Sequence, residues 1–343
     1  PTYPSVTQGA VRSYDLVAKN IPLWDQAQIK ATVGDSVDYK TLQIRGPFVA
    51  ARDQKGKVTR YFPQPADSIY VDENDLTLIK ALEPKEKPES IKTSLSTPKL
   101  LLDEKKPVKG KGNLWLPEQA LLNYMRGEVA QGVPAERLFL PENRMGIGMD
   151  DQANTTLEAA LYEVQYIRPR KGVGLAIEVN GYDDWPIEGV LRLGGEGHAG
   201  RFEHFPGKDW PLLTTDNGKK EKKINWPQNK VDLPADRFKI YFATPTFFKH
   251  GWEPASWDDF FLKGDVTLEA AALRRYQSLG GFNMAKDPRS AGAHKPARRY
   301  VPAGSVYYFS HQNNTVLNPN LIQNAITHYG AEIGFGQIII GRW

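Results

Sequence analysis

Arginine side chains stand beside two glycine-rich turns, and this pairing is the strongest chemical signal in the sequence. Arg192 leads into the run at 193–200 (LGGEGHAG), and Arg342 follows the turn at 334–336 (GFG). Glycine lets a backbone approach a phosphate closely and expose its N–H donors, while the arginine guanidinium group supplies forked donors to phosphate oxygens. The two turns therefore predict a surface that binds a ribose-phosphate chain.

Three more arginines extend this pattern. Arg12 lies on the polar face of a predicted helix, and Arg298-Arg299 precede a predicted strand. Residues 237–343 carry 12 Lys and Arg against 7 Asp and Glu, a moderate basic excess. A solvated or ion-paired arginine has the same signature, so no single position decides the question. Taken together with the glycine turns, the arginines favour a single-stranded nucleic-acid partner.

The spacing Gly195-x-Gly197-x-x-Gly200 also matches the fingerprint of dinucleotide-binding proteins, which opens a helix after a strand. Here the next residues, 201–205 (RFEHF), alternate like a strand and run into Pro206. The sequence therefore gives little support to a nucleotide-dependent oxidoreductase, and we expect no cofactor.

Metal and catalytic chemistry have little support. The six histidines show no HExxH or i,i+4 pairing, and the chain has no cysteine. The adjacent carboxylates at 150–151 and at 258–259 point to opposite faces if they lie in strands, so we interpret them as solvated surface. We expect no metal site and no enzyme activity. The alternative is a metal-independent endoribonuclease with His198 or His250 as general acid or base.

Composition predicts a globular protein of two domains. The chain has 343 residues, of which 40% are apolar and 24% charged. The absence of cysteine fits a reducing compartment, and no apolar run reaches the roughly 20 residues that span a bilayer. We expect a cytoplasmic location and no membrane partner. The sequence opens at Pro1, directly before a capped helix, so an opening strand of the first domain is expected to be missing.

The elements that would position these residues can be outlined. In the first domain, at 1–206, we expect an amphipathic helix at 5–19, a solvated and partly disordered insertion at 83–112, a short helix from Pro117, and strands at 162–166, 173–179 and 190–193, with a long excursion from a hairpin at about 141–160. A polar linker follows at 207–235. The second domain, at 236–343, has predicted strands at 238–242, 301–309 and 337–340 and a helix at 319–329. That order is the second half of a ferredoxin-like unit.

Six motifs in order resemble a known family over nearly the whole chain. They are PSxxQGAVRS at 4–13, RMGIGMD at 144–150, LRLGGEG at 191–197, TP at 244–245, VPAGSVYY at 301–308 and GFG at 334–336, with LY at 161–162 between them. This order resembles the RAMP subunit that caps the 5′ end of the crRNA in Cmr-type (type III-B) CRISPR effector complexes.

The resemblance implies an α+β fold of two ferredoxin-like (RAMP, RRM-like) domains with antiparallel sheets, a thumb hairpin and long insertions. It implies a non-catalytic subunit that binds the crRNA 5′ tag and the nearby guide–target duplex, and contacts the large polymerase/nuclease subunit and the backbone RAMP subunit. Ile147 and Met149, at the apolar tip of the thumb, would wedge beside the duplex. The residues expected to contact RNA are Gln8, Gly9, Arg12, Ser13, Arg144, Gly146, Ile147, Met149, Arg192, Gly194, Gly195, Gly197, Lys249, His250, Arg298, Arg299, Gly334, Gly336 and Arg342.

Overall fold

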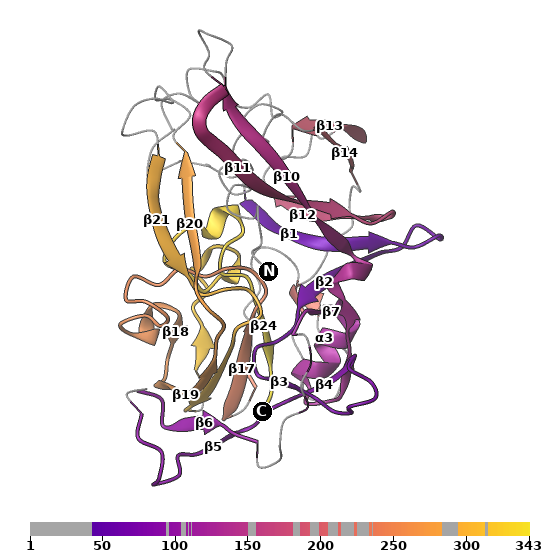
Figure 1. Ribbon diagram of the computed structural model, residues 1–343. Coiled ribbons are helices and arrows are strands. Elements are labelled where there is room, and N and C mark those ends of the chain that lie inside the picture. Colours follow the sequence, from indigo (N-terminus) through magenta and orange to yellow (C-terminus); the bar gives the residue numbers. More distant parts are fainter. Residues whose placement is uncertain are drawn as a thin grey trace.

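The structure is a computed structural model, which describes residues 43–93, 96–103, 108, 110, 112–149, 156–180, 186–192, 199–204, 212–213, 223–224, 233–234, 236–282, 294–312 and 315–343 (Figure 1). The helix predicted at 5–19 and most of the predicted linker at 207–235 lie outside these residues. Sheets dominate the described part, and they are antiparallel throughout. The predicted α+β class with antiparallel sheets is therefore confirmed. Far more of the described residues lie in strands than in helices.

The first half of the chain builds a five-stranded sheet in the order β12-β1-β2-β7-β9. Its strands are β1 (Gln43–Arg52), β2 (Val58–Pro63), β7 (Leu114–Pro117), β9 (Val133–Pro134) and β12 (Val173–Asn180). A smaller sheet in the order β3-β4-β8 lies beside it, formed by β3 (Ser68–Tyr70), β4 (Leu78–Ala81) and β8 (Ala130–Gln131). A short 3-10 turn, η1 (Ala135–Arg137), leads from β9 toward the hairpin described below.

The short helix predicted from Pro117 is confirmed as α3 (Glu118–Met125). Proline suits the position just before the helix because it needs no N–H partner there. The helix buries Leu121, Leu122, Tyr124 and Met125, so one whole side of it belongs to the core. It thereby joins the two halves of the molecule (Figure 1).

The second half forms a four-stranded sheet in the order β19-β22-β17-β24. Its strands are β17 (Arg237–Phe242), β19 (Val266–Ala272), β22 (Val306–His311) and β24 (Ile338–Gly341). Numbered along the chain, this order is 2-3-1-4 with all neighbours antiparallel, which is the ferredoxin-like arrangement. The strands predicted at 238–242 and 337–340 are confirmed, whereas the one predicted at 301–309 begins only at Val306.

Alternate residues of β17 face two different hydrophobic clusters. Phe238, Ile240 and Phe242 belong to a cluster of the second half alone, with Phe248, Phe260 and Phe309 among its members. Tyr241, on the other face, packs with side chains of the first half such as Phe62 and Tyr124. The central strand is apolar on both faces because it is covered on both sides. The predicted domain limits remain a prediction, but the two sheets share one core.

The helix predicted at 319–329 is wrong. The segment holds one 3-10 turn instead, η3 (Ile322–Asn324), and a second, η4 (Ala331–Ile333), follows it. Gln323 and Asn324 have positive φ angles, which an α-helix does not accept. The amide of Ile326 bonds to Gly336 and that of His328 to Phe247, so the backbone is satisfied by neighbouring loops rather than within a helix. The apolar spacing reflects contacts to the sheet, which a loop can also make.

The predicted solvated insertion at 83–112 contains ordered structure. Strands β5 (Pro84–Glu86) and β6 (Lys99–Leu101) pair as a hairpin. Lys99 lies 3.5 Å from Glu269 on β19 and 5.5 Å from the ring of Trp343. The hairpin therefore covers part of β19, the edge strand of the second sheet. Such cover prevents unwanted pairing of an edge strand with another chain.

Further hairpins and short strands complete the described chain: β10 (Phe139–Met149) with β11 (Thr156–Pro169), β13 (Glu188–Arg192) with β14 (Ala199–Glu203), β15 (Leu212–Leu213) with β16 (Lys223–Ile224), β18 (Phe261–Leu262) with β23 (Val316–Leu317), β20 (Gln277–Phe282) with β21 (His294–Tyr300), and the 3-10 turn η2 (Trp257–Asp259). The strands predicted at 162–166 and 173–179 lie within β11 and β12. The strand predicted at 190–193 belongs to β13, which ends at Arg192. None of the helices in the described ranges is both long and apolar enough to span a bilayer.

Candidate nucleic-acid interface

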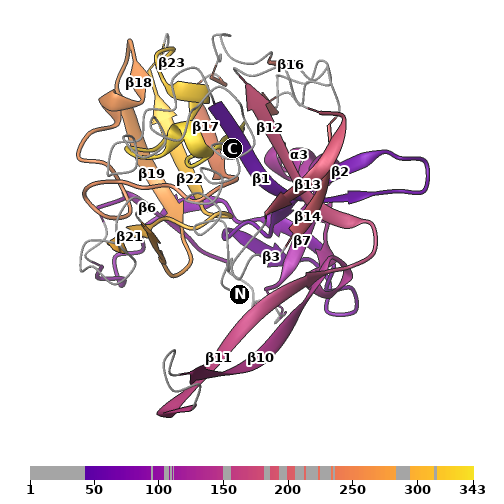
Figure 2. The same ribbon diagram turned by 90° about the horizontal axis from the view of Figure 1, so that it is seen from above.

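The predicted excursion at 141–160 is a long hairpin, which we call the thumb hairpin (β10 and β11). Its strands pair without interruption from Phe139 opposite Pro169 to Ile147 opposite Leu161. Both views show it projecting away from the two sheets (Figures 1 and 2). Alternation of polar and apolar residues makes it a two-faced ribbon, because successive side chains in a strand point to opposite faces.

One face of the thumb hairpin carries exposed apolar side chains near its tip, with Glu163 opposite Met145. Met145, Ile147 and Leu161 have exposed fractions of 66%, 53% and 61%. Ile147 and Leu161 stand directly opposite each other, and Met145 shares their face by strand periodicity. Met149 belongs to β10, but its side chain lies outside the described residues. Large apolar side chains gathered at the end of a projecting ribbon are typical of a contact surface.

The other face carries charge. Glu142 accepts hydrogen bonds from Arg144, at 2.9 Å, and from Arg168, at 2.6 Å. The guanidinium group of Arg144 also lies 4.9 Å from the ring centre of Tyr166. The hydrogen bond from Arg168, followed by that from Arg144, lowers the pKa of Glu142. Arg144, a predicted RNA contact, is thus ion-paired within the hairpin, and Gly146 is an ordinary strand residue opposite Tyr162.

The turn at 334–336 is filled by protein. Gly334 has a φ of +93°, and a Cβ there would overlap the carbonyl oxygen of Gly46 on β1. Gly336 has a φ of +70°, and a Cβ there would lie 2.6 Å from Thr327 and 2.7 Å from the carbonyl oxygen of Ile326. Packing and backbone conformation therefore require both glycines.

The amides of this turn are also engaged. Its three N–H groups donate to backbone carbonyls of the same chain: Gly334 to Ala331, Phe335 to Gly330 and Gly336 to Pro245. A phosphate would need these donors free. RNA contact at Gly334 and Gly336 stays a prediction from the family resemblance, without the exposed donors that motivated it. Arg342, just beyond the strand that follows, is exposed and donates its backbone amide to Met125.

The second glycine-rich run is flanked by a hairpin. Arg192 ends β13, where its backbone pairs with Ala199 of β14. Its side chain and residues 193–198, including Gly194, Gly195 and Gly197, lie outside the described residues, as do Gln8, Gly9, Arg12 and Ser13. A strand rather than a helix follows the run, so the dinucleotide fingerprint lacks the helix N-terminus that it needs.

Arg298 and Arg299 lie on opposite faces of β21. The guanidinium group of Arg298 is 4.3 Å from the ring centre of Tyr329, in a half-buried position. That of Arg299 is exposed and lies 4.8 Å from the ring centre of Tyr276, whose exposed fraction is 47%. Tyr276 was not among the residues predicted from the sequence, because only the pairing of β20 with β21 brings it to Arg299.

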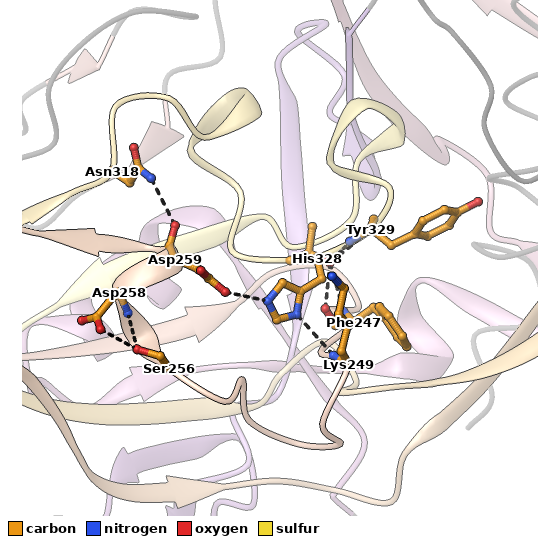
Figure 3. Close-up of polar contacts among 9 residues, drawn as sticks. Phe247, Lys249, Ser256, Asp258, Asp259, Asn318, His328 and Tyr329 are labelled. Carbon is orange, nitrogen blue, oxygen red and sulfur yellow. Dashed lines mark hydrogen bonds and ion pairs between the residues drawn. The ribbon is translucent and has the colours of Figure 1, made fainter.

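Lys249 and His250 are exposed on a loop between β17 and η2, where Phe248 and Gly251 form a single bridge (Figure 3). The loop is held by His328, whose Nδ1 accepts the backbone N–H of Lys249 at 3.2 Å. Nε2 of His328 must therefore carry the proton, and it donates to Asp259 at 3.2 Å. Both ring nitrogens are occupied, so His328 fastens the loop rather than offering a free base.

Catalytic chemistry gains no support from the described residues. Within them, His250 is an exposed loop residue, and His198 lies outside them. A general base needs a proton to abstract within hydrogen-bond reach and an orienting partner. In the same residues, no group of three or more His, Asp and Glu side chains could hold a metal ion.

The sequence of this chain matches a known family. The model of a family described as CRISPR-associated protein (Cas_Cmr3) matches residues 1–343. Among solved structures, the chain is similar to one in a cryo-EM structure of the Type III-B Cmr-beta bound to cognate target RNA, with 14% identity and a TM-score of 0.45 over 97% of this chain and 87% of that chain.

It is also similar to a chain in the cryo-EM structure of Cmr-beta bound to cognate target RNA and AMPPnP, state 1. The identity is 13% and the TM-score 0.45, over 87% of this chain and 76% of that chain. A search of the curated proteins found no match. The family model covers the entire sequence, and the chain therefore belongs to the Cas_Cmr3 family of CRISPR-associated proteins.

Proposed function

We propose that this protein is a non-catalytic, RNA-binding subunit of a type III-B CRISPR effector complex. In that role it anchors the crRNA 5′ tag and joins the large polymerase/nuclease subunit to the backbone RAMP subunit. Membership of the Cas_Cmr3 family over residues 1–343 is the observation that carries the proposal. The exposed apolar face of the thumb hairpin supports it, since such a ribbon can enter the stack of a guide–target duplex.

Electrostatics adds to this support. Lys249, His250, Arg299 and Arg342 are exposed, and the part of the chain that contains them has a basic excess. RNA backbones attract such surfaces, and single-stranded RNA is read by stacking on aromatic rings and guanidinium planes. The interface thus has two chemistries: an apolar wedge on the thumb hairpin and cationic groups on the second half.

Sequencing the RNA that copurifies with the protein from its native host tests this function. We expect guides that share one constant 5′ sequence. A binding assay with a synthetic guide and with the same guide lacking that sequence then measures tag preference. Copurified RNA without a shared 5′ sequence, or equal affinity for both guides, would overturn the proposal.

A further inference from the structure

Several exposed arginines of this protein have a glutamate partner, and the arginines near β20 and β21 differ from them. On the first sheet and on two hairpins, exposed arginines form ion pairs with glutamates: Arg52 with Glu203, Arg144 and Arg168 both with Glu142, and Arg201 with Glu188. By contrast, none of Arg274, Arg275, Arg298 and Arg299 forms an ion pair with a described residue. These four belong to the strand ends around β20 and β21.

Two of the four have internal tasks. Arg274 donates to the carbonyl oxygens of Gly112, at 3.0 Å, and Gln64, at 3.5 Å, which ties this region to the first half of the chain. Arg298 is half-buried against Tyr329. The two remaining arginines, Arg275 and Arg299, are exposed.

Tyr276 contacts one of these two cations and follows the other in the chain. It follows Arg275 directly and stands against the guanidinium group of Arg299. An exposed tyrosine ring beside a guanidinium plane is a flat, cationic platform held in place before any ligand arrives. The backbone supports it, because Gln277 pairs with Tyr300 and Ser278 with Arg299, and both Leu279 and Tyr300 are buried beneath.

We infer that Tyr276 and Arg299, with Arg275 beside them, form a stacking site for an unpaired RNA nucleotide. The base would stack on the ring or on the guanidinium plane, and the nearby positive charge would attract the adjoining phosphate. The inference rests on the proposed RNA-binding function and extends it to a second, sequence-tolerant contact that involves Tyr276.

An acidic protein surface is the competing occupant, because exposed arginines also bind carboxylates. Such a partner would require the charges of Arg275 and Arg299 but no planar ring. RNA is favoured by the stack itself and by membership of the CRISPR-associated family. The ring requirement separates the two occupants.

The test measures binding of fluorescein-labelled oligouridine and of an RNA duplex to the full chain by anisotropy. We expect Tyr276→Ala to weaken oligouridine binding about 5- to 150-fold, the usual effect of removing one stacked base contact. Duplex binding should change far less. Tyr276→Phe should bind like the wild type, and Tyr276→Leu like the alanine variant. Arg201→Ala is the matched control, since it removes an exposed arginine that is already paired with Glu188.

Arg299→Lys gives a second readout. It keeps the charge and removes the plane, so affinity should fall while the salt slope stays unchanged. Equal binding by Tyr276→Ala and wild type would overturn the stacking site, as would wild-type affinity in Tyr276→Leu. Failure of the tag preference described above, with Tyr276→Ala still defective on oligouridine, would remove the proposed function and leave the stacking site. A wild-type chain that binds no RNA would overturn both.

Discussion

Gly334, in the turn before β24, lies against the carbonyl oxygen of Gly46 on β1, with no room for a side chain between them. This contact joins the last turn of the second half to the first strand of the first sheet. It explains the glycine before Phe335, a buried ring that packs on Tyr300 with ring centres 4.9 Å apart. The glycine turn is a structural joint between the two halves of the chain.

Gly334→Ala is therefore expected to destabilise the protein by about 2–5 kcal/mol, from the strained φ together with the overlap with Gly46. The matched control is Gly56→Ala, because Gly56 also has a positive φ, of +80°, but no atom within 4 Å of the point that a Cβ would occupy. The control should lose only about 1 kcal/mol. Urea unfolding measures both, and equal losses would contradict the packing role.

Tyr308 is expected to make the stability pH-dependent in alkali. It is buried and donates to Asp67, as does Tyr124 at 2.7 Å. Burial, and then the charge of Asp67, raises the pKa of Tyr308 well above its usual value near 10. The folded chain thus keeps a proton that the unfolded chain releases, so this stabilisation is complete below about pH 10 and declines above it.

Tyr308→Phe should reduce that decline by up to about 1.4 kcal/mol per pH unit above pH 10. It should also lower the overall stability by about 1.5–3 kcal/mol, because Asp67 loses a hydrogen-bond donor. Unfolding free energies between pH 8 and about pH 11 separate the two effects. The same alkaline slope in both proteins would show that Tyr308 does not hold its proton on folding.

Ile147→Ser is expected to leave the stability within about 0.5 kcal/mol of the wild type, because the side chain is half exposed on the thumb hairpin. The same change at Ile79, which is fully buried, should cost several kcal/mol and serves as the control for the unfolding assay. In the assembled complex, Ile147→Ser should reduce the fluorescence of a 2-aminopurine placed at the wedge step of the guide–target duplex, since an unwedged base stays stacked. Unchanged fluorescence would count against the wedge.

RNA binding is expected to depend on salt. If about six phosphates are contacted, log K should fall against log salt with a slope of roughly −4, from about −0.7 per phosphate on a single strand. Titrations of a tagged guide at increasing KCl measure the slope. A flat response would show that the cationic groups do not contact the backbone.

Cleavage assays address the alternative function. We expect no metal-independent cleavage of repeat RNA by the wild type in EDTA, and no difference for His250→Ala, since no described side chain orients the His250 ring. Products that appear with the wild type and disappear with His250→Ala or His198→Ala would establish an endoribonuclease instead.

Local sequence patterns determined much of the fold. Period-two alternation predicted the strands now seen as β11, β12 and β17, and the polar, glycine-rich stretch between Leu140 and Leu161 predicted an excursion from a hairpin. These signals are local because each strand shows its own polar and apolar faces. The place of Ile147 at an apolar tip was implied by the family resemblance, and its side chain is half exposed in the structure.

Three other features could not be predicted from local patterns, because they depend on contacts between residues far apart in the sequence. The apolar stripe at 319–329 forms a single 3-10 turn and irregular backbone, because loops around Phe247 and Gly336 accept its N–H groups. The same long-range packing filled the space in front of Gly334 with Gly46 and set Tyr276 against Arg299 through strand pairing. A glycine allows another group to approach its backbone closely, and an arginine allows contact with an anion. Which group makes that contact depends on the residues that the fold brings next to it.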